Sequence, residues 1–371
     1  MNILFFIHSL SNGGAERVTA TLANFRVEKG WSITLVTVAD IKDDFYNLDS
    51  RIERVSLGMA QNSRTPVHAV INNLRRIREL RQVLIGRRPD VAVAMMATAN
   101  VTLALAARST GVPVVGSERT YPPAMPLGLF WEWMRRKAYP WLDYLVAQTN
   151  ESASWLELNA APKHLAVIPN PLSYPLLPQD PIVNPGEIMS QLGRRKLLLA
   201  VGRLGTEKGF DRLLSAFGLL AERFPDWGLI ILGTGSLQEQ LVQQISDLGL
   251  EGQVAMPGAV GNVGDWYELA DIYVLASRFE GFPNTLVEAL AYGVPSIAVD
   301  CKTGPREILR DGVDGFLVSQ DDNEALASAI EKLMRDGTRR ALFAAKAIEI
   351  RERLAVERVA SDWEEVFRKL Q

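Results

Sequence analysis

The chain has 371 residues, of which 47% are hydrophobic and 22% charged, and this composition excludes a disordered chain, a collagen-like repeat and a disulfide-rich scaffold. Its one cysteine, Cys301, cannot form an internal disulfide, and its three scattered histidines form no zinc-binding cluster. Because single hydrophobic cores stop growing near ~250–300 residues, two domains with a cleft between them are expected.

Charge is distributed unevenly along the chain. Residues 1–180 carry 19 Lys and Arg against 15 Asp and Glu, a net charge of +4, which leaves 21 against 28, or −7, for residues 181–371. Much of the basic excess is a group of seven arginines that has one acid, Glu79, among them. The arginines are Arg64, Arg75, Arg76, Arg78, Arg81, Arg87 and Arg88. A segment of this kind suits an anionic surface.

No targeting or membrane-spanning segment is predicted. Residues 1–10 lack the basic leader and the small-residue cleavage site of a secretory signal, which predicts a cytoplasmic protein. The most apolar run, residues 91–107, is at the lower length limit of a membrane span and carries three polar residues. It is therefore predicted to be a buried strand followed by a core helix.

Short apolar runs alternate with helical stretches in the first half of the chain. The expected strands are residues 2–7, 32–38, 91–96, 112–117 and 144–148, and the clearest helices are residues 15–29 and 67–87. Such alternation predicts repeated right-handed crossovers in a doubly wound parallel sheet. Six prolines between positions 168 and 185 then predict a linker.

The same pattern restarts after the linker. Strands are expected at residues 196–201, 228–232, 272–276 and 295–299, which predicts a second doubly wound domain. The last helix, residues 356–370, carries apolar residues at i, i+3, i+4 and i+7 along one face. A stripe of this width must pack on a sizeable surface.

The densest run of chemically informative residues is Glu-Gly-Phe-Pro-Asn-Thr-Leu-Val-Glu-Ala at 280–289. The glycine and proline after Glu280 prevent a helix from starting there, so Glu280 is predicted in a loop and Glu288 in or just after the first turn of a helix. The backbone N–H groups of residues 284–286 then form an anion site suited to a diphosphate. In the alternative interpretation, Glu288 only suits a helix start and Glu280 is a solvated loop charge.

A second motif, Gly-Arg-Leu-Gly-Thr-Glu-Lys-Gly at residues 202–209, follows the first strand of the second domain. Ligands of doubly wound sheets bind at the carboxyl ends of the strands. Glycines around Arg203 and Lys208 give a flexible, doubly cationic loop that can neutralise a diphosphate. The alternative is an ordinary polar turn.

Two glycine turns carry weaker signals. Ser-Asn-Gly-Gly-Ala-Glu-Arg at residues 11–17 follows the first strand, but it is neither a GxGxxG fingerprint nor a phosphate-binding P-loop. Gly-Thr-Gly at residues 233–235 follows an apolar run in the second domain. Either segment is compatible with a tight strand-to-helix turn.

Together these motifs resemble the large retaining glycosyltransferase family four over nearly the whole chain. The most specific part is residues 280–289 followed by Gly-Val-Pro at 293–295, and the pattern continues at Gly304, Glu307 and residues 312–315. The resemblance implies an α/β protein of GT-B architecture, with two facing Rossmann-like doubly wound domains and an interdomain cleft.

The resemblance also implies the roles of the two domains. Residues 1–172 form the acceptor-binding domain and residues 173–355 the domain that binds the nucleotide sugar. The C-terminal helix, residues 356–371, packs back onto the first domain. That arrangement gives the apolar stripe of the last helix a partner.

Site residues follow from the resemblance position by position. Arg203 and Lys208 match the clamp on the donor diphosphate, Glu288 the ribose-binding carboxylate, and Glu280 the carboxylate that holds the donor sugar. The other donor-binding positions are Gly14, Gly261, Asn262, Phe282, Pro283, Asn284, Thr285 and Leu286. The family is thought to use a front-face, retaining substitution in which the departing phosphate takes the acceptor proton, and the cationic residues stabilise the charge that develops on it.

One position departs from the family pattern. Many members place a histidine near the transferred sugar, after the fourth or fifth strand of the first domain, and Glu118-Arg119 stand at that place here. Arginine cannot act as a base, and Glu118 is taken as the candidate catalytic residue of the first domain. The chain contains no Asp-x-Asp triplet, so transfer is expected to need no metal or other cofactor.

Two segments suggest the kind of acceptor. The arginine-rich segment and Phe-Trp-Glu-Trp-Met-Arg-Arg-Lys at residues 130–137 both suggest contact with anionic lipid headgroups. On a helical wheel Arg75 and Arg76 lie beside an apolar stripe while Arg81 falls within it, so a solvated helix face packed on a core stays an alternative. A salt-sensitive peripheral attachment, supported by Arg75 and Arg76, is predicted at an anionic inner-membrane surface.

The predicted function is transfer of a hexose or N-acetylhexosamine from a nucleotide sugar, UDP-linked by preference, to a lipid-linked glycan such as a polyprenyl-diphosphate oligosaccharide or a lipopolysaccharide with its O-antigen. No nucleic-acid partner is expected. Two alternatives remain: a nucleotide-sugar enzyme with a soluble acceptor, such as an epimerase or a sugar synthase, and a noncatalytic glycolipid-binding assembly component. A dinucleotide dehydrogenase is disfavoured because no GxGxxG follows a strand.

Overall fold

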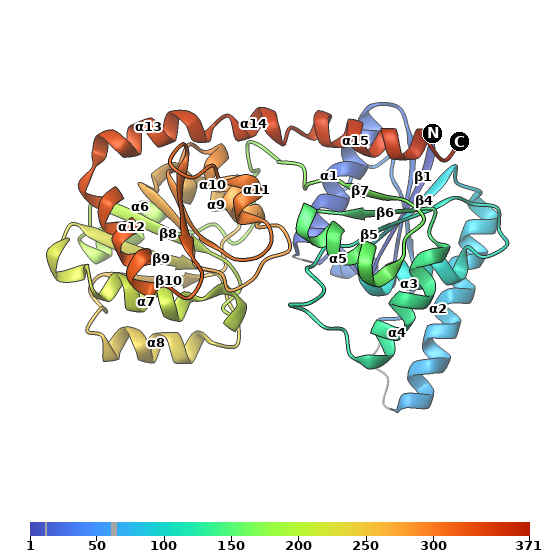
Figure 1. Cartoon of the computed structure of the whole chain (residues 1–371), viewed down its shortest axis with the longest axis horizontal. Coiled ribbons are helices and arrows are strands. Elements are labelled where there is room, and N and C mark those ends of the chain that lie inside the picture. The colour runs from blue at the N-terminus through green and yellow to red at the C-terminus, as the bar shows by residue number, and fades with distance from the viewer. Residues whose placement is uncertain (12, 61–64) are drawn as a thin grey trace. The chain divides into compact units, whose positions relative to one another are not determined.

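The computed structural model describes residues 1–11, 13–60 and 65–371. Asn12 and Arg64, which belong to two of the predicted segments, lie outside the described residues. The chain divides into two compact units, unit 1 with residues 1–171 and 354–371 and unit 2 with residues 172–353. Each unit contains its own parallel sheet flanked by helices (Figure 1), which confirms the prediction of an α/β protein with two Rossmann-like sheets.

The described residues of unit 1 form a seven-stranded sheet in the order β3-β2-β1-β4-β5-β6-β7, with every neighbouring pair parallel. The strands are β1 (Asn2–Ile7), β2 (Ser32–Thr37), β3 (Glu53–Ser56), β4 (Val91–Met95), β5 (Val114–Ser117), β6 (Tyr144–Ala147) and β7 (Leu165–Val167). The strand order reverses between β1 and β4. In doubly wound sheets ligands bind at this topological switch point, outside the carboxyl ends of the strands.

The helices of unit 1 form two layers on its sheet. They are α1 (Gly14–Glu28), α2 (Pro66–Arg87), α3 (Ala97–Ala106), α4 (Leu129–Ala138), α5 (Asn150–Ala160) and α15 (Val356–Arg368). Helices α2 to α5 bury their apolar residues in one core cluster, whereas α1 and α15 share another on β1. The stripe of α15 is buried there through Trp363 and Phe367, and Glu364 beside it forms a 2.8 Å ion pair with Arg26 of α1.

Unit 2 repeats the architecture with a six-stranded sheet of described residues in the order β10-β9-β8-β11-β12-β13. Its strands are β8 (Lys196–Val201), β9 (Trp227–Leu232), β10 (Val254–Gly258), β11 (Ile272–Leu275), β12 (Ser296–Asp300) and β13 (Gly315–Ser319). Its helices are α6 (Pro185–Leu192), α7 (Phe210–Gly218), α8 (Gln238–Asp247), α9 (Val263–Leu269), α10 (Asn284–Ala291), α11 (Pro305–Ile308), α12 (Asn323–Arg335), α13 (Gly337–Ala347) and α14 (Ile350–Arg353). The switch point of this sheet lies between β8 and β11.

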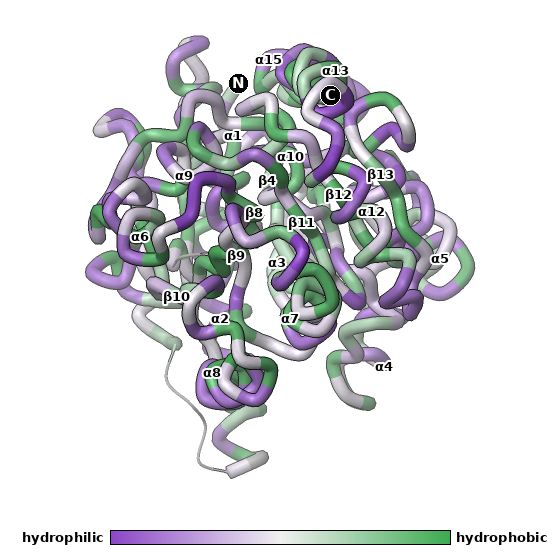
Figure 2. The backbone as a smooth tube through the Cα atoms, turned by 90° about the vertical axis from the view of Figure 1, so that its left-hand side faces the viewer, coloured by the Kyte–Doolittle hydropathy of each residue, from purple (hydrophilic) through white to green (hydrophobic). Residues whose placement is uncertain are grey.

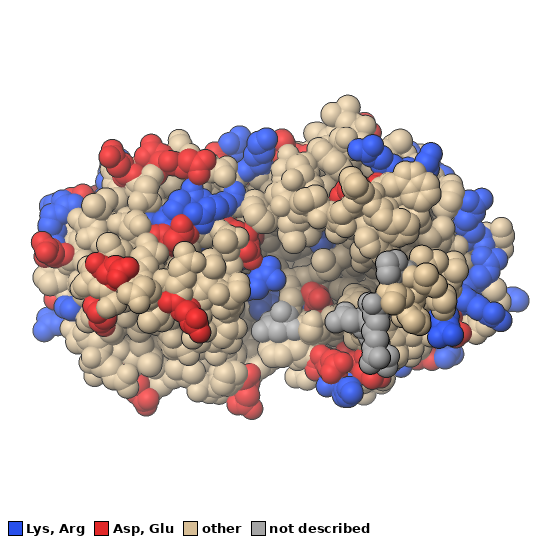
Figure 3. Space-filling model, turned by 90° about the horizontal axis from the view of Figure 1, so that it is seen from below, with Lys and Arg blue, Asp and Glu red and all other residues tan. Residues whose placement is uncertain are grey.

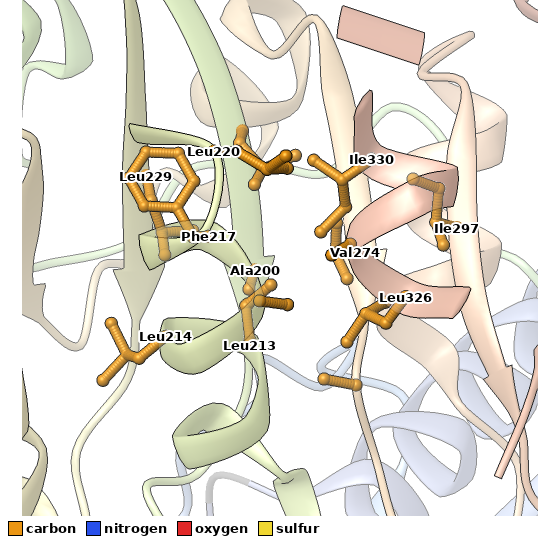
Figure 4. Packing of buried hydrophobic residues seen from close by; sticks show 14 of the residues in the cluster. Ala200, Leu213, Leu214, Phe217, Leu220, Leu229, Val274, Ile297, Leu326 and Ile330 are labelled. Atoms are coloured by element: carbon orange, nitrogen blue, oxygen red, sulfur yellow. The ribbon is translucent and has the colours of Figure 1, made fainter. Parts of the chain in front are cut away.

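The core of unit 2 holds that switch point rigidly. Side chains from the central strands, such as Ala200 and Val274, meet Leu213 of α7 and Ile330 of α12, and all are at most 1% exposed (Figure 4). Interiors packed to this degree are as dense as organic crystals, so the loops that leave β8 and β11 start from fixed positions. Figure 2 shows the complementary pattern on α8, where hydrophobic and hydrophilic residues alternate around a helix that covers the outside of the unit.

Candidate active site

A buried ion pair joins the two loops at the switch point of unit 2. Lys208, in the loop after β8, places its Nζ 2.7 Å from Oε1 of Glu280, in the loop after β11. Ser277 donates its hydroxyl to the same oxygen at 2.6 Å, and Glu280 is only 8% exposed. Oε2 of Glu280 has no hydrogen-bond partner in the described part of the chain. Glu280 is thus a buried, oriented carboxylate, and the alternative of a solvated loop charge is wrong.

Glycines allow these loops to approach each other. Gly209 has a φ of +65°, and a Cβ added there would lie 2.2 Å from the carbonyl oxygen of Ala276. Gly233, with a φ of +135°, would place a Cβ 1.9 Å from the carbonyl oxygen of Gly202. No side chain fits at either distance, so the glycine turn at residues 233–235 braces the loop that carries the two predicted cations.

Arg278 fixes the cationic loop to the Glu280 loop, a role that the sequence reasoning missed. Its backbone N–H donates to the carbonyl oxygen of Glu207 at 2.8 Å, and its guanidinium donates to the carbonyl of Thr206 at 2.8 Å. The same guanidinium donates hydrogen bonds to both carboxylate oxygens of Asp211, at 2.8 and 2.6 Å. These hydrogen bonds lower the pKa of Asp211 below its usual value. An arginine two residues before Glu280 and three residues after a buried strand was the available signal.

Arg203 lies apart from the buried pair. Its side chain is 69% exposed and its Nε donates to Glu207 at 3.0 Å. The loop after β8 therefore presents one exposed and one mostly buried cation, Arg203 and Lys208, of which only Lys208 contacts Glu280. An exposed guanidinium remains able to turn toward an anionic ligand because its ion pair with Glu207 costs little to break.

Glu288 is the second buried carboxylate of the site. It lies at the fifth residue of α10, as predicted, is 4% exposed, and accepts a hydrogen bond from the hydroxyl of Tyr267 at 3.1 Å. The hydroxyl of Tyr273, on β11, donates to the hydroxyl of Thr285 on α10 at 2.7 Å. Burial, followed by the charges of Glu280 and Glu288, raises the pKa of Tyr273.

The start of α10 differs from the prediction at one residue. Leu286 donates its N–H to the carbonyl of Pro283 at 3.1 Å and its side chain is fully buried, so it offers no N–H to an anion. The helix begins at Asn284, and Asn284 and Thr285 are partly exposed. Phe282 and Pro283 are buried and shape the loop.

Gly261 and Asn262 hold the linker onto unit 2. The Asn262 side chain is bonded to the backbone N–H and carbonyl of Val183 at 3.0 and 2.9 Å and to Asp265 at 2.7 Å. Gly261 exchanges backbone hydrogen bonds with Gln179 and Pro181. The Asn262 amide is 2% exposed and its hydrogen-bonding groups are engaged within the protein, and the assignment of Gly261 and Asn262 as donor-binding positions stays a prediction.

The predicted site residues of unit 1 have different surroundings. Gly14 is exposed at the first residue of α1, after the carboxyl end of β1. Glu118 has no exposed side-chain surface: Tyr139 donates to it at 2.7 Å, Thr120 at 3.1 Å, and Arg135 lies 3.6 Å away. Burial raises the pKa of Glu118. A carboxylate enclosed in this way has a structural place in the core, and the catalytic role of Glu118 stays a prediction.

Neighbouring Arg119 is equally enclosed. Its guanidinium donates to Asn170 at 2.6 Å, and burial lowers its pKa to about 9. Over the described ranges, no group of three or more His, Cys, Asp or Glu side chains is arranged to hold a metal ion. In the same residues, no helix combines the length and apolar character needed to cross a membrane.

Comparison with known proteins identifies this arrangement. Residues 188–350 match the family model described as glycosyl transferases group 1, and residues 13–171 match the model of a glycosyl transferase 4-like domain. The protein is thus a glycosyltransferase with the GT-B fold. The chain belongs to glycosyltransferase family four, as its motifs predicted.

Individual relatives extend this finding. An α-1,4-N-acetyl-D-galactosaminyltransferase of Campylobacter jejuni, whose name specifies an undecaprenyl-diphosphate-linked glycan, is 28% identical over 91% of this chain and 89% of its own. An exopolysaccharide phosphotransferase of Streptomyces coelicolor is 35% identical over 62% of this chain. The matched segment covers only 24% of the length of that protein. The crystal structure of Anabaena HepE with UDP superposes over the whole of both chains with a TM-score of 0.81 at 22% identity, which shows the shared fold.

Proposed function

We propose that the protein transfers a hexose or N-acetylhexosamine from a UDP-linked sugar to a lipid-linked glycan, with retention of the anomeric configuration. The observation that carries the proposal is the pairing of Lys208 with Glu280 at the switch point of unit 2, with Glu288 buried on the adjoining helix. One cation and two carboxylates in this order suit the three parts of such a donor: diphosphate, sugar and ribose.

Each part has a separate task in the proposed reaction. Glu288 accepts hydrogen bonds from the ribose hydroxyls, and the unpartnered oxygen Oε2 of Glu280 accepts one from the donor sugar. The bond between the anomeric carbon and the phosphate oxygen breaks while the acceptor hydroxyl bonds to that carbon from the same face. The departing phosphate takes the hydroxyl proton, and Lys208 with Arg203 stabilises the negative charge that develops on it.

Transfer is proposed to need no divalent metal. Lys208, Arg203 and the start of α10 supply the positive potential that a metal would otherwise provide at the diphosphate. Turnover is expected to be unchanged after treatment with EDTA. A complete loss that only Mg²⁺ or Mn²⁺ restores would contradict this assignment of the cations.

The Campylobacter relative supports a lipid-linked acceptor, and the UDP in the HepE crystal supports the nucleotide. The test is incubation of the full chain with UDP-, GDP- and dTDP-sugars and a short-chain polyprenyl-diphosphate oligosaccharide, followed by NMR of the product. An α-linkage formed from an α-configured UDP-sugar is the expected product. Transfer only to free sugars would favour a soluble acceptor, and neither transfer nor donor hydrolysis would favour a noncatalytic glycolipid-binding role.

Unit 1 also carries a surface suited to a membrane. Packing on a core was the alternative for the apolar stripe in the first half of α2, but these residues are exposed, as are apolar residues of α4. This apolar surface consists of Val67, Val70, Ile71, Leu74, Leu129, Phe130 and Trp133. Leu129 is 93% exposed and Val67 67%, and what sets these residues apart from scattered exposed apolar residues is that they are grouped on two helices.

Basic side chains accompany the apolar surface. Arg75, Arg78, Arg136 and Lys137 are exposed on the same two helices. In the part of Figure 3 that draws unit 1, its right half, blue basic side chains border a broad uncharged face. Apolar side chains that enter the headgroup region beside cations that meet anionic lipids are the pattern of a peripheral membrane protein.

Attachment is therefore proposed to combine insertion with charge. Arg76 contributes less to it than the sequence predicted, because its guanidinium donates to the carbonyl of Met59. Sedimentation with phosphatidylglycerol vesicles should fall strongly for Leu129→Glu with Trp133→Glu and persist in part at high salt for the wild type. Leu158→Glu, at an 85% exposed position on α5, is the matched control. Equal sedimentation of all three proteins would refute the proposal.

A further inference from the structure

Unit 1 contains a cavity of about 190 Å³ at the switch point of its sheet. Phe6 lines it from the end of β1, His8 from just after β1, and Val38 from just after β2. Its polar and aromatic wall comes from three helices, with Asn73 and Arg76 on α2, Thr98 and Thr102 on α3, and Trp131 on α4. Pockets for drug-sized ligands measure ~300–1,000 Å³, so this cavity suits one ring with a substituent rather than a nucleotide.

Arg76 gives the cavity a positive charge that no carboxylate balances. No lining residue is acidic, and Arg76 has no ion pair within the described ranges. A guanidinium has five N–H donors; Arg76 uses two on the carbonyl of Met59, at 3.1 and 2.6 Å, and one on Asn73 at 3.2 Å. Two donors therefore remain on a guanidinium whose orientation is fixed. Partial burial lowers its pKa, as expected for a cation that lacks a counter-ion.

The rest of the wall suits a sugar. Trp131 offers an aromatic ring, and Asn73, Thr98 and Thr102 offer groups that bond hydroxyls. Thr98 also lies in the first turn of the ten-residue helix α3, whose leading N–H groups have no acceptors within the helix and favour a nearby anion. A sugar with a negative substituent would therefore find an aromatic ring for its apolar face, polar side chains for its hydroxyls and a helix start for its charge.

The cavity also adjoins the apolar surface defined above. Asn73 and Arg76 flank Leu74 on α2, and Trp131 lies between Phe130 and Trp133 on α4. A ligand in the cavity is thus held by the same two helices that are proposed to enter the lipid headgroups. In a lipid-linked glycan, the group nearest the membrane is a sugar joined to phosphate.

We propose that this cavity binds a pyranose that carries a phosphate on its anomeric oxygen, the membrane-proximal sugar phosphate of the acceptor. The ring stacks on Trp131, its hydroxyls bond Asn73 and the two threonines, and the phosphate receives the two remaining N–H groups of Arg76. The identification of the ligand as part of the acceptor rests on the proposed function. The affinity of the cavity for a sugar phosphate does not.

The test is direct binding to the full chain by calorimetry and ligand-observed NMR. N-acetylglucosamine 1-phosphate is the probe, with free N-acetylglucosamine and inorganic phosphate as separate arms. Arg76→Met should weaken binding of the probe about tenfold or more, because two hydrogen bonds to a charged group are lost. Arg51→Met, at an exposed arginine of unit 1 that has no assigned role, should leave it unchanged, and both variants should bind UDP as the wild type does.

Each outcome decides a separate point. Equal binding of the probe by Arg76→Met and wild type, or no binding at millimolar concentration, would overturn the cavity assignment. Inorganic phosphate bound as tightly as the probe would overturn the sugar part, and Trp131→Leu, expected to weaken only the sugar arms, checks the same point. Probe binding without transfer to any lipid-linked acceptor would refute the proposed function and leave the sugar-phosphate site standing.

Discussion

Changing Glu280 or Glu288 to glutamine should affect two different quantities, turnover for Glu280 and UDP binding for Glu288. Glu288, buried on α10 under the hydroxyl of Tyr267, is assigned to a part of the donor that does not change during the reaction. Glu288→Gln should therefore weaken UDP binding and leave turnover at saturating donor nearly unchanged. Glu280 is assigned to the sugar, which UDP lacks, so Glu280→Gln should lower turnover and spare UDP binding.

The contacts set the expected sizes. A lost charged hydrogen bond to the ribose is worth about 1.5–3 kcal/mol, which raises the dissociation constant of UDP roughly ten- to 150-fold. Loss of a group that acts as charge develops is worth about 2.7–4 kcal/mol, or roughly 10²–10³ in turnover. Because Lys208 is 2.7 Å from Glu280, the neutral variant also releases this cation, and UDP should bind as tightly as before or more tightly.

The assay pairs calorimetric titration of UDP with initial rates over a range of donor concentrations. Tyr267→Phe removes the hydroxyl that orients Glu288 and should give a smaller loss of UDP affinity than Glu288→Gln. Glu239→Gln, at an exposed carboxylate on α8, is the control for charge alone. Exchanged phenotypes would reverse the assignment, and wild-type transfer by both variants would refute the site as a whole.

Two further predictions concern unit 1. Glu118→Gln should transfer sugar at the wild-type rate, because this side chain is enclosed. The pKa of Glu118 is raised in the folded protein, so the wild type loses free energy of unfolding as the pH rises above the ordinary value of 4.5. Thermal unfolding from pH 5 to 8 should therefore show the melting temperature of the variant rising relative to that of the wild type. A hundredfold loss of transfer would support the catalytic role of Glu118. Trp363→Ala should destabilise unit 1 by about 3–5 kcal/mol in urea unfolding, whereas the exposed Trp133→Ala should cost under about 0.5 kcal/mol. Equal losses would argue against the docking of α15 on α1.

The central strands were predictable because burial on both faces gives continuous apolar runs. Such continuous apolar runs are found in the central strands β1, β4, β8 and β11. The edge strands β3, β7, β10 and β13 were not predicted, since they are less buried than the central strands and their apolar runs are short or interrupted. Sequence pattern therefore locates the interior of a parallel sheet better than its borders.

The site was predictable as a set of residues and not as a set of contacts. Motif spacing placed Glu280 in a loop and Glu288 just beyond a helix start, and both positions are correct. The 2.7 Å pair between Lys208 and Glu280 joins residues 72 apart in the chain, and it exists because β8 and β11 are neighbours in the sheet. Only the strand order brings those loops together, and Arg278 then fixes them.

The sequence left open whether the apolar stripe of α2 packs on a core, and the length of the helix decides the question. The apolar period of residues 67–77 correctly identified a face of the helix, but periodicity does not say how far the covering surface extends. A helix of 22 residues is about 33 Å long, whereas strands of four to six residues span roughly 13–20 Å. Half of such a helix must extend beyond its sheet.

The extending half can be identified from the connection. α2 leads from the carboxyl end of β3 to the start of β4, so its first residues lie at the carboxyl edge of the sheet, where ligands bind. Leu80 and Leu84, near its end, are fully buried, while Val67 and Leu74 are exposed. Apolar residues kept on the part of a helix that no sheet can cover require another partner. The proposed membrane surface, and the cavity beside it, follow from that mismatch in length.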